Sequence, residues 1–293
     1  MASYAANVTD EFVLPAVIVD QHDHPIGCIG DDDGIFFYNF RADRARELTR
    51  ALTEPTFEAF PRKVVPKLAA FATMTSYDET FTHPAAFPPF RLTRILPELI
   101  SERGLKQLRI AETEKYAHVT YFFNGGDEKA YPGEDRVLIP SPRDVTTYDL
   151  KPQMSAREVA DEAMRRIESR QYHLIVLNFA NPDMVGHTGN LKAAIQAAEV
   201  IDECLNKVIS AMRRIGGAVV LTADHGNLEQ MVDYETGQPH TAHTLNPVPC
   251  IIVDDRPHAL RASGVLADIA PTILMVMGLP QPPEMTGVSL IKE

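Results

Sequence analysis

Short apolar runs alternate with longer amphipathic segments over most of the chain after residue 92. The apolar runs predict strands at 106–112, 136–140, 173–180, 217–223 and 249–255. The segments with helical periodicity predict helices at 94–104, 154–170, 191–216 and 266–278. Ser155 and Glu158 have the spacing of a capping box, which we expect to begin the second of these helices. Such alternation predicts a mainly parallel sheet with helices on both faces, an α/β fold.

The part of the chain before residue 80 has its own pattern of apolar runs. It predicts strands at 14–20 and 34–40, a helix at 41–52, and a strand that enters a loop within 67–78. The stretch THPAAFPPF (82–90) follows, and its prolines remove backbone donors and interrupt both helix and sheet. We therefore predict a partial α/β domain at 1–80, a proline-rich hinge at 81–91 and a second α/β domain at 92–293.

Composition and charge narrow the function classes. The chain has 293 residues and a formal net charge of −12 at pH 7, which argues against a general nucleic-acid binder. Cys28, Cys204 and Cys250 form no CxxC pair, so we expect free thiols in a reducing compartment. No apolar run approaches the roughly 20 residues of a membrane span, and MASYAANVTDEF does not resemble a signal peptide. We expect a cytoplasmic protein with neither a nucleic-acid nor a membrane partner.

Residues of metal-ligand type follow the predicted strands. Three loops at the same predicted edge of the sheet carry Asp183 and His187, Asp224 and His225, and His240 and His243. One helical turn, or a tight loop relieved by Gly186, would direct Asp183 and His187 at one ion. A carboxylate with one or two imidazoles suits Mn²⁺, Zn²⁺ or Fe²⁺. The sequence thus predicts a metal site, in which His240 is the weaker candidate of its pair.

Three basic residues are candidates for phosphate binding near two metal ions. Arg41 and Arg44 are three apart in the helix predicted at 41–52, so we expect both on one helical face. Lys115 lies in a loop after a predicted strand, and Gly125 and Gly126 further along would allow close backbone approach. Read alone, each of these residues also fits an ordinary solvated surface.

Seven stretches together resemble the cofactor-independent phosphoglycerate mutases of the alkaline-phosphatase superfamily. They are TDEFVLPAVI, FFYNFRADRAREL, LRIAETEKYAHVTYFFNGG, YDLKPQMSA, NFANPDMVGHTGN, LTADHGNLEQM and HTAHTLNPVPCIIV, and they follow the family's order. The resemblance implies an alkaline-phosphatase-like sheet preceded by a partial transferase domain. It implies a glycolytic isomerase that interconverts 3-phosphoglycerate and 2-phosphoglycerate through a phosphoserine intermediate, without 2,3-bisphosphoglycerate. It also implies two Mn²⁺ ions, with Zn²⁺, Fe²⁺ or Co²⁺ as alternatives.

The resemblance assigns a role to each candidate residue. Asp183, His187 and His243 resemble the ligands of one metal ion. Asp224 and His225 resemble ligands of the other. Arg41 and Arg44 resemble the substrate-binding arginines, and Lys115 resembles the lysine that reaches the transferring phosphate.

Members of that family are considerably longer at the N-terminus, and the nucleophilic serine belongs to that extra segment. We therefore expect this chain to correspond to a C-terminal part whose phosphatase-like domain lacks its first strand. On its own it should be inactive, and it should self-associate or need an N-terminal fragment, although the family is usually monomeric. Two alternatives stay open: a metal-dependent phosphatase, phosphopentomutase or sulfatase of the same superfamily, and a non-catalytic metal-binding remnant.

Overall fold

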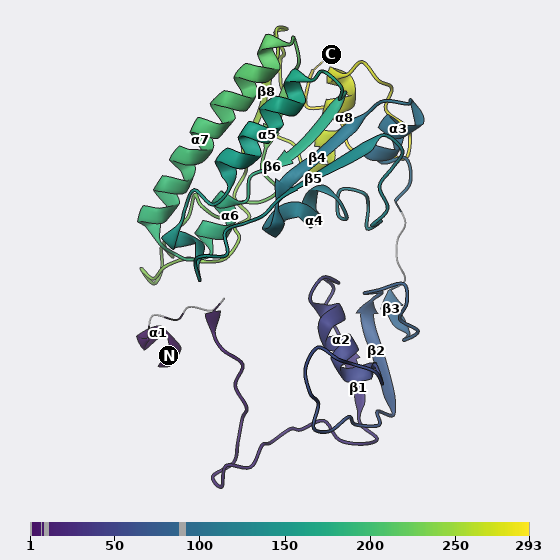
Figure 1. Cartoon of the computed structure of the whole chain (residues 1–293), viewed down its shortest axis with the longest axis vertical. Coiled ribbons are helices and arrows are strands. Elements are labelled where there is room, and N and C mark those ends of the chain that lie inside the picture. Colours follow the sequence, from purple (N-terminus) through teal and green to yellow (C-terminus); the bar gives the residue numbers. More distant parts are fainter. Residues whose placement is uncertain (1, 7, 9–11, 88–91, 293) are drawn as a thin grey trace. The chain divides into compact units, whose positions relative to one another are not determined.

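The computed structural model describes residues 2–6, 8, 12–87 and 92–292, which fold as two units (Figure 1). The larger unit comprises Met1–Val13 and Leu92–Glu293, and the smaller comprises Leu14–Arg91. Residues 88–91, the end of the predicted hinge, lie outside the described residues. None of the helices in the described parts of the chain is both long and apolar enough to cross a bilayer.

Parallel strands build the larger unit. β4 (Gln107–Glu112) lies between β5 (Glu134–Ile139) and β6 (Leu174–Asn178), and all three run in the same direction. β7 (Val219–Thr222) and β8 (Cys250–Val253) form a separate antiparallel pair. Each predicted strand of this unit is therefore confirmed, but the direction of β8 departs from a purely parallel arrangement.

Helices connect and cover these strands. The α-helices are α1 (Ala2–Ala5), α3 (Leu96–Glu102), α4 (Tyr116–Val119), α5 (Ala156–Glu168), α6 (Asn181–Gly186), α7 (Leu191–Arg214) and α8 (Ile269–Val276). Single 3₁₀ turns are η2 (Thr113–Lys115), η3 (Tyr148–Leu150) and η4 (Leu266–Asp268). The four helices predicted after residue 92 are all present.

The two faces of the parallel sheet bury different helices. Ile110 of β4 packs on α5 through Val159, and α7 lies beyond α5 (Figure 1). On the other side, α3 and α8 share an apolar cluster in which Leu99 and Leu274 are fully buried. Each such side chain contributes about 1.5–3 kcal/mol by leaving water, so these clusters hold the helices against the sheet.

The predicted capping box at α5 is wrong. Ser155 does occupy the N-cap position, but its side chain accepts no capping hydrogen bond. Its Oγ instead donates to the carbonyl of Pro140 at 2.8 Å, and its backbone N–H donates to Oε1 of Glu112 at 3.0 Å. Glu112, at the end of β4, thus takes the place expected for Glu158 as the acceptor for the N-cap N–H.

A cavity separates the parallel sheet from the β7–β8 pair. Among the described residues, β6 pairs only with β4, and β7 pairs only with β8. Between these two strands lies a cavity of about 470 Å³ whose walls include Ile175, Val220 and Ile273. The facing edges of β6 and β7 therefore have backbone groups without a strand partner on this side.

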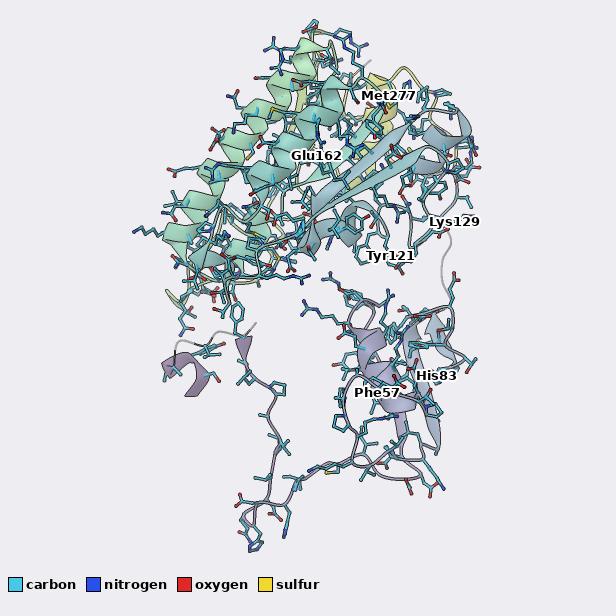
Figure 2. All side chains as sticks on the ribbon, viewed as in Figure 1. Phe57, His83, Tyr121, Lys129, Glu162 and Met277 are labelled. Atoms are coloured by element: carbon cyan, nitrogen blue, oxygen red, sulfur yellow. The ribbon has the colours of Figure 1, made fainter. Side chains whose placement is uncertain are left out.

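The smaller unit is a second parallel sheet. β1 (Gly34–Phe37), β2 (Ala70–Thr75) and β3 (Ala85–Phe87) lie in this order, and α2 (Ala45–Thr53) connects the first two. Figure 2 marks the unit by Phe57 and His83, and the larger unit by Glu162 of α5 and Met277 after α8. β3 forms within the predicted hinge, since Pro84 precedes it and needs no ladder donor there.

The strand predicted at 14–20 is wrong. This apolar run forms only an isolated bridge from Val19 to Pro25, and Leu14 is 81% exposed. Alternation of apolar residues predicts a strand only where a neighbouring strand or helix covers one face, and the described residues provide none.

Candidate metal centre

α6 supplies the first two groups of the candidate site. It begins directly after β6, with Pro182 in its first turn, where a missing N–H costs nothing. Asp183 lies in this turn and His187 is the C-cap, so the two side chains meet at i and i+4. Oδ1 of Asp183 is 3.2 Å from Nε2 of His187. Of the two local geometries predicted for this pair, the structure has the helical turn.

His243 reaches the same point from a distant loop. Its Nε2 lies 3.0 Å from Oδ1 of Asp183 and 3.2 Å from Nε2 of His187. The potential ligand atoms of these three residues all lie within 4.8 Å of one another. The structure thus brings together side chains that are 56 positions apart in the sequence.

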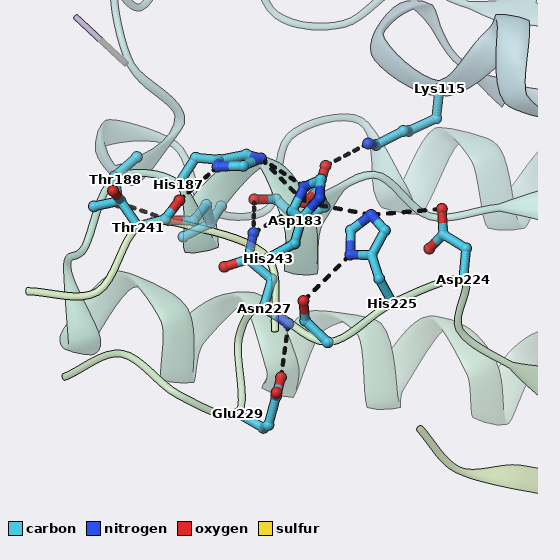
Figure 3. A network of polar contacts seen from close by, with 12 residues as sticks. Lys115, Asp183, His187, Thr188, Asp224, His225, Asn227, Glu229, Thr241 and His243 are labelled. Carbon is cyan, nitrogen blue, oxygen red and sulfur yellow. Dashed lines mark hydrogen bonds and ion pairs between the residues drawn. The ribbon is translucent and has the colours of Figure 1, made fainter. Parts of the chain in front are cut away.

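The loop after β7 adds two more groups. Nε2 of His225 lies 3.9 Å from Oδ1 of Asp183 and 3.6 Å from Oδ2 of Asp224. The rings of His225 and His243 stack with their centroids 3.7 Å apart. All five predicted ligand residues therefore belong to one polar network (Figure 3). His240 is not part of the three-residue ligand cluster.

Backbone carbonyls orient the imidazole rings. Nδ1 of His187 is 2.7 Å from the carbonyl oxygen of Thr241, and Nδ1 of His225 is 3.3 Å from that of Gly226. A carbonyl oxygen can only accept, so these hydrogen bonds place the proton on Nδ1. The Nε2 lone pairs are then left to face Asp183, which is the usual arrangement of metal-binding histidines.

The electrostatics keep Asp183 ionised. Its carboxylate accepts hydrogen bonds from Nζ of Lys115, which is only 7% exposed, and from Nδ2 of Asn227 at 2.9 Å. Burial raises the pKa of Asp183, but the positive charge and hydrogen bond of Lys115, together with the hydrogen bond from Asn227, outweigh burial and hold this pKa far below its usual value. Burial lowers the pKa of His243, against the opposing effect of Asp183, and so favours the neutral imidazole that binds metals.

The donor set fits a divalent cation. One carboxylate and two imidazoles with their lone pairs converging within 4.8 Å are a typical set for Mn²⁺, Zn²⁺, Fe²⁺ or Co²⁺. Nε2 of His187 and Nε2 of His243 lie 3.2 Å apart, close enough for both to bind one ion. We conclude that the residues present suit a divalent metal ion.

The three basic candidates lie in two different units. Lys115 ends η2 in the larger unit. Arg41 and Arg44 belong to the smaller unit, and the expectation that they share a helical face is wrong. α2 begins at Ala45, so Arg44 is its N-cap and Arg41 lies in the preceding loop, beside Asp43 at 3.8 Å. Residues 41–44, which the periodicity assigns to the helix, belong to the loop after β1.

The sequence assigned no role to three polar residues that connect the ligand loops: Asn227, Glu229 and Thr244. Asn227 follows the Asp-His-Gly motif directly, and this polar continuation of the strand-end loop was the available signal. The role expected for Gly186 also changes. Its backbone is ordinary helix, and a Cβ there would lie 2.3 Å from Oδ1 of Asn227, so glycine is needed for close approach.

Comparison with known proteins agrees with this geometry. Residues 48–281 match the family model described as the metalloenzyme superfamily. The chain belongs to the metalloenzyme superfamily. Residues 1–79 of this superfamily member also match the model of the N-terminus of 2,3-bisphosphoglycerate-independent phosphoglycerate mutases. The mixed α/β fold and the family resemblance expected from the sequence are both confirmed.

The most similar relatives of this metalloenzyme superfamily member have one name in common. The chain is 58% identical to a 2,3-bisphosphoglycerate-independent phosphoglycerate mutase of Symbiobacterium thermophilum and 57% identical to one of Myxococcus xanthus. These matches cover 99% of the chain but only 55% and 56% of the two relatives. The chain therefore spans about half the length of the curated relatives it matches.

A solved structure supports the same relationship. A phosphoglycerate mutase of Leishmania mexicana, described at low cobalt concentration, matches 94% of the chain and 53% of its own length. The match has a TM-score of 0.81 at 36% sequence identity. The likeness thus extends over nearly all of this superfamily member.

Proposed function

We propose that the chain carries the metal centre of a 2,3-bisphosphoglycerate-independent phosphoglycerate mutase, which interconverts 3-phosphoglycerate and 2-phosphoglycerate in glycolysis. The convergence of Asp183, His187 and His243 on one point is the observation that carries this proposal. The names of the relatives support this reaction, and the donor set suits the metal-assisted phosphoryl transfer that it requires.

The ligands divide between two Mn²⁺ ions in this proposal. Asp183, His187 and His243 hold one ion, and Asp224 with His225 contributes to the other. Nε2 of His225 lies 3.9 Å from Oδ1 of Asp183 and 3.6 Å from Oδ2 of Asp224, so the two ligand groups adjoin each other, as paired catalytic metals about 3.5–4 Å apart require. When bound, such ions stabilise negative charge on the phosphoryl group and on the oxygens between which it moves.

The basic residues act on the substrate. The ammonium of Lys115, buried beside Asp183, stabilises charge on the transferring phosphoryl group. Arg41 and Arg44 bind the anionic groups of the phosphoglycerate, for which guanidinium groups are well suited. Holding the glycerate while the phosphoryl group moves between hydroxyls distinguishes a mutase from a phosphatase.

The nucleophilic serine comes from outside these residues in our proposal. Among the described residues, the hydrogen bonds and ion pairs of this polar network involve lysine, acidic, histidine, threonine and asparagine side chains, and no serine. The relatives have almost as much additional sequence again. The cavity between β6 and β7 would accept a further strand, and so supports an N-terminal segment completing this sheet.

The absence of a serine from the described network favours a second candidate, a metal-binding remnant without catalysis. One experiment separates the candidates. The purified chain is titrated with Mn²⁺ by calorimetry beside its D183N variant, which removes a ligand charge at constant shape. Turnover of 3-phosphoglycerate is then measured with and without the N-terminal part of the Symbiobacterium thermophilum relative.

We expect tight Mn²⁺ binding that D183N abolishes, and mutase activity only with the added fragment. Binding without rescue would support the remnant, and release of inorganic phosphate would support a phosphatase of the same superfamily. Failure of the wild-type chain to bind Mn²⁺ would overturn the metal centre itself.

A further inference from the structure

The ligand loops are connected by hydrogen bonds that lie outside the ligand set. Asn227, only 4% exposed, donates from Nδ2 to Oδ1 of Asp183 at 2.9 Å and to the carbonyl of Asp183 at 3.2 Å. These bonds hold both the side chain and the backbone of the residue to which both imidazoles point. Asn227 is therefore placed to determine where the Asp183 carboxylate lies (Figure 3).

Asn227 is itself held by a clamp, which Glu229, two residues further along the same loop, forms with Thr244 of the next loop. Its backbone N–H donates to Oε2 of Glu229 at 2.7 Å, while Oε1 of Glu229 accepts from the hydroxyl of Thr244 and from Nδ2 of Asn246 at 2.9 Å. The N–H of Thr244 donates to the carbonyl of Gly226 at 2.8 Å. The clamp thus joins the loop of His225 to the loop of His243.

Two glycines allow these loops to approach so closely. A Cβ at Gly226 would lie 2.2 Å from Oγ1 of Thr244, and one at Gly186 would lie 2.3 Å from Oδ1 of Asn227. Neither distance is compatible with a side chain at these positions unless the neighbour moves. The loops that carry Asp183, His225 and His243 are therefore in direct contact through Asn227 and Thr244.

We infer that Asn227 is a positioning residue of the metal centre, and that the Glu229–Thr244 clamp fixes it in place. This inference rests on the proposed metal centre. Asn227 makes its contact with the carboxylate of Asp183 through an N–H donor, which cannot bind a cation. It acts through Asp183, and hydrogen-bonding partners of ligands typically change metal affinity about 10–100-fold.

The test uses the full chain and Co²⁺, whose visible d–d absorption reports coordination geometry. N227A is compared with N206A, which removes an exposed asparagine of α7 and serves as the matched control. We expect N227A to weaken Co²⁺ binding by at least about tenfold and to change the d–d spectrum. N206A should match the wild type in both measurements.

A second pair of variants tests the clamp without touching Asn227. T244V replaces the hydroxyl by a methyl of similar shape, while T244S restores the donor to Glu229. T244V should weaken Co²⁺ binding and T244S should recover it, with circular dichroism of the metal-free proteins unchanged. This pair also decides the matter if N227A fails to fold.

The outcomes separate this inference from the proposed function. If the wild type binds Co²⁺ and both N227A and T244V have its affinity and spectrum, Asn227 does not position the site, while the metal centre stands. If the wild type does not bind Co²⁺, the metal centre itself fails.

Discussion

A buried carboxylate shows how much a single residue can matter outside the ligand set. Glu112 at the end of β4 is fully buried, and Oε1 accepts the N–H of Ser155 while Oε2 has no hydrogen-bond partner among the described residues. Burial raises the pKa of Glu112 to about 7, against the lowering effect of the hydrogen bond from the backbone N–H of Ser155. Neutral Glu112 therefore stabilises the fold better than its ionised form.

This raised pKa predicts a pH dependence of stability. Between pH 4.5, the ordinary pKa of a glutamate, and about pH 7, the folded state retains a proton that the unfolded state has lost, so stability falls as pH rises. The contribution of Glu112 to the free energy of unfolding should fall by about 3 kcal/mol over this window. Urea denaturation of metal-free wild type and E112Q at pH 5 and 7.5 measures it.

We expect E112Q to gain stability relative to the wild type as pH rises, because glutamine cannot ionise. E199Q, which removes an exposed carboxylate on α7, serves as the control and should follow the wild type. A constant difference between E112Q and the wild type at both pH values would contradict the prediction.

At the scale of elements, the sequence predicted most of the strands and helices. It was less successful in predicting the residues at which they end and the elements that they contact. Asp183 and His187 could be paired because they are four positions apart, which is a helical spacing. Asp224 and His225 could be paired because both directly follow an apolar strand. Asn227 was not found, since its partner Asp183 is 44 positions away and no local pattern encodes that contact. The strand predicted at 14–20 was wrong for a related reason. The pattern of apolar residues does not reveal whether another strand or helix covers that segment.

The close contact between α6 and the loop after β7 predicts an unusual result for G186A. Helix propensity alone favours alanine over glycine by about 1 kcal/mol. The new Cβ, however, would lie 2.3 Å from Oδ1 of Asn227, which is buried and held by Asp183, and such overpacking costs about 1–3 kcal/mol. We therefore expect G186A to lower the free energy of unfolding by about 1 kcal/mol and to weaken Mn²⁺ binding.

Denaturation and calorimetric titration of G186A test this expectation. G34A is the control, because a Cβ at Gly34 meets no atom within 4 Å, and it should leave Mn²⁺ binding unchanged. A G186A protein that is more stable than the wild type, with unaltered affinity, would show that α6 and the loop can separate freely.

At the scale of the whole molecule, the sequence predicts parallel sheets in both parts of the chain. It does not predict which strand edges lack a partner strand. Strand–helix alternation indicates a parallel sheet, but it does not say which strands are neighbours or which edges stay open. The structure leaves β6 and β7 facing a cavity of about 470 Å³ instead of each other. Nothing in either strand's own sequence distinguishes an open edge from a paired one.

Open strand edges with apolar walls favour pairing between chains, so we expect this chain to self-associate as its concentration rises. Charged side chains, lysine above all, are how natural proteins suppress such pairing. Ala218 lines the cavity just before β7, so A218K should shift the chain towards a monomer in sizing chromatography. A198K adds the same charge on an exposed position of α7 and should not. If A218K associates as strongly as A198K, a surface other than the β6 and β7 edges is responsible for the association. A wild-type chain that stays monomeric at every concentration contradicts the prediction altogether.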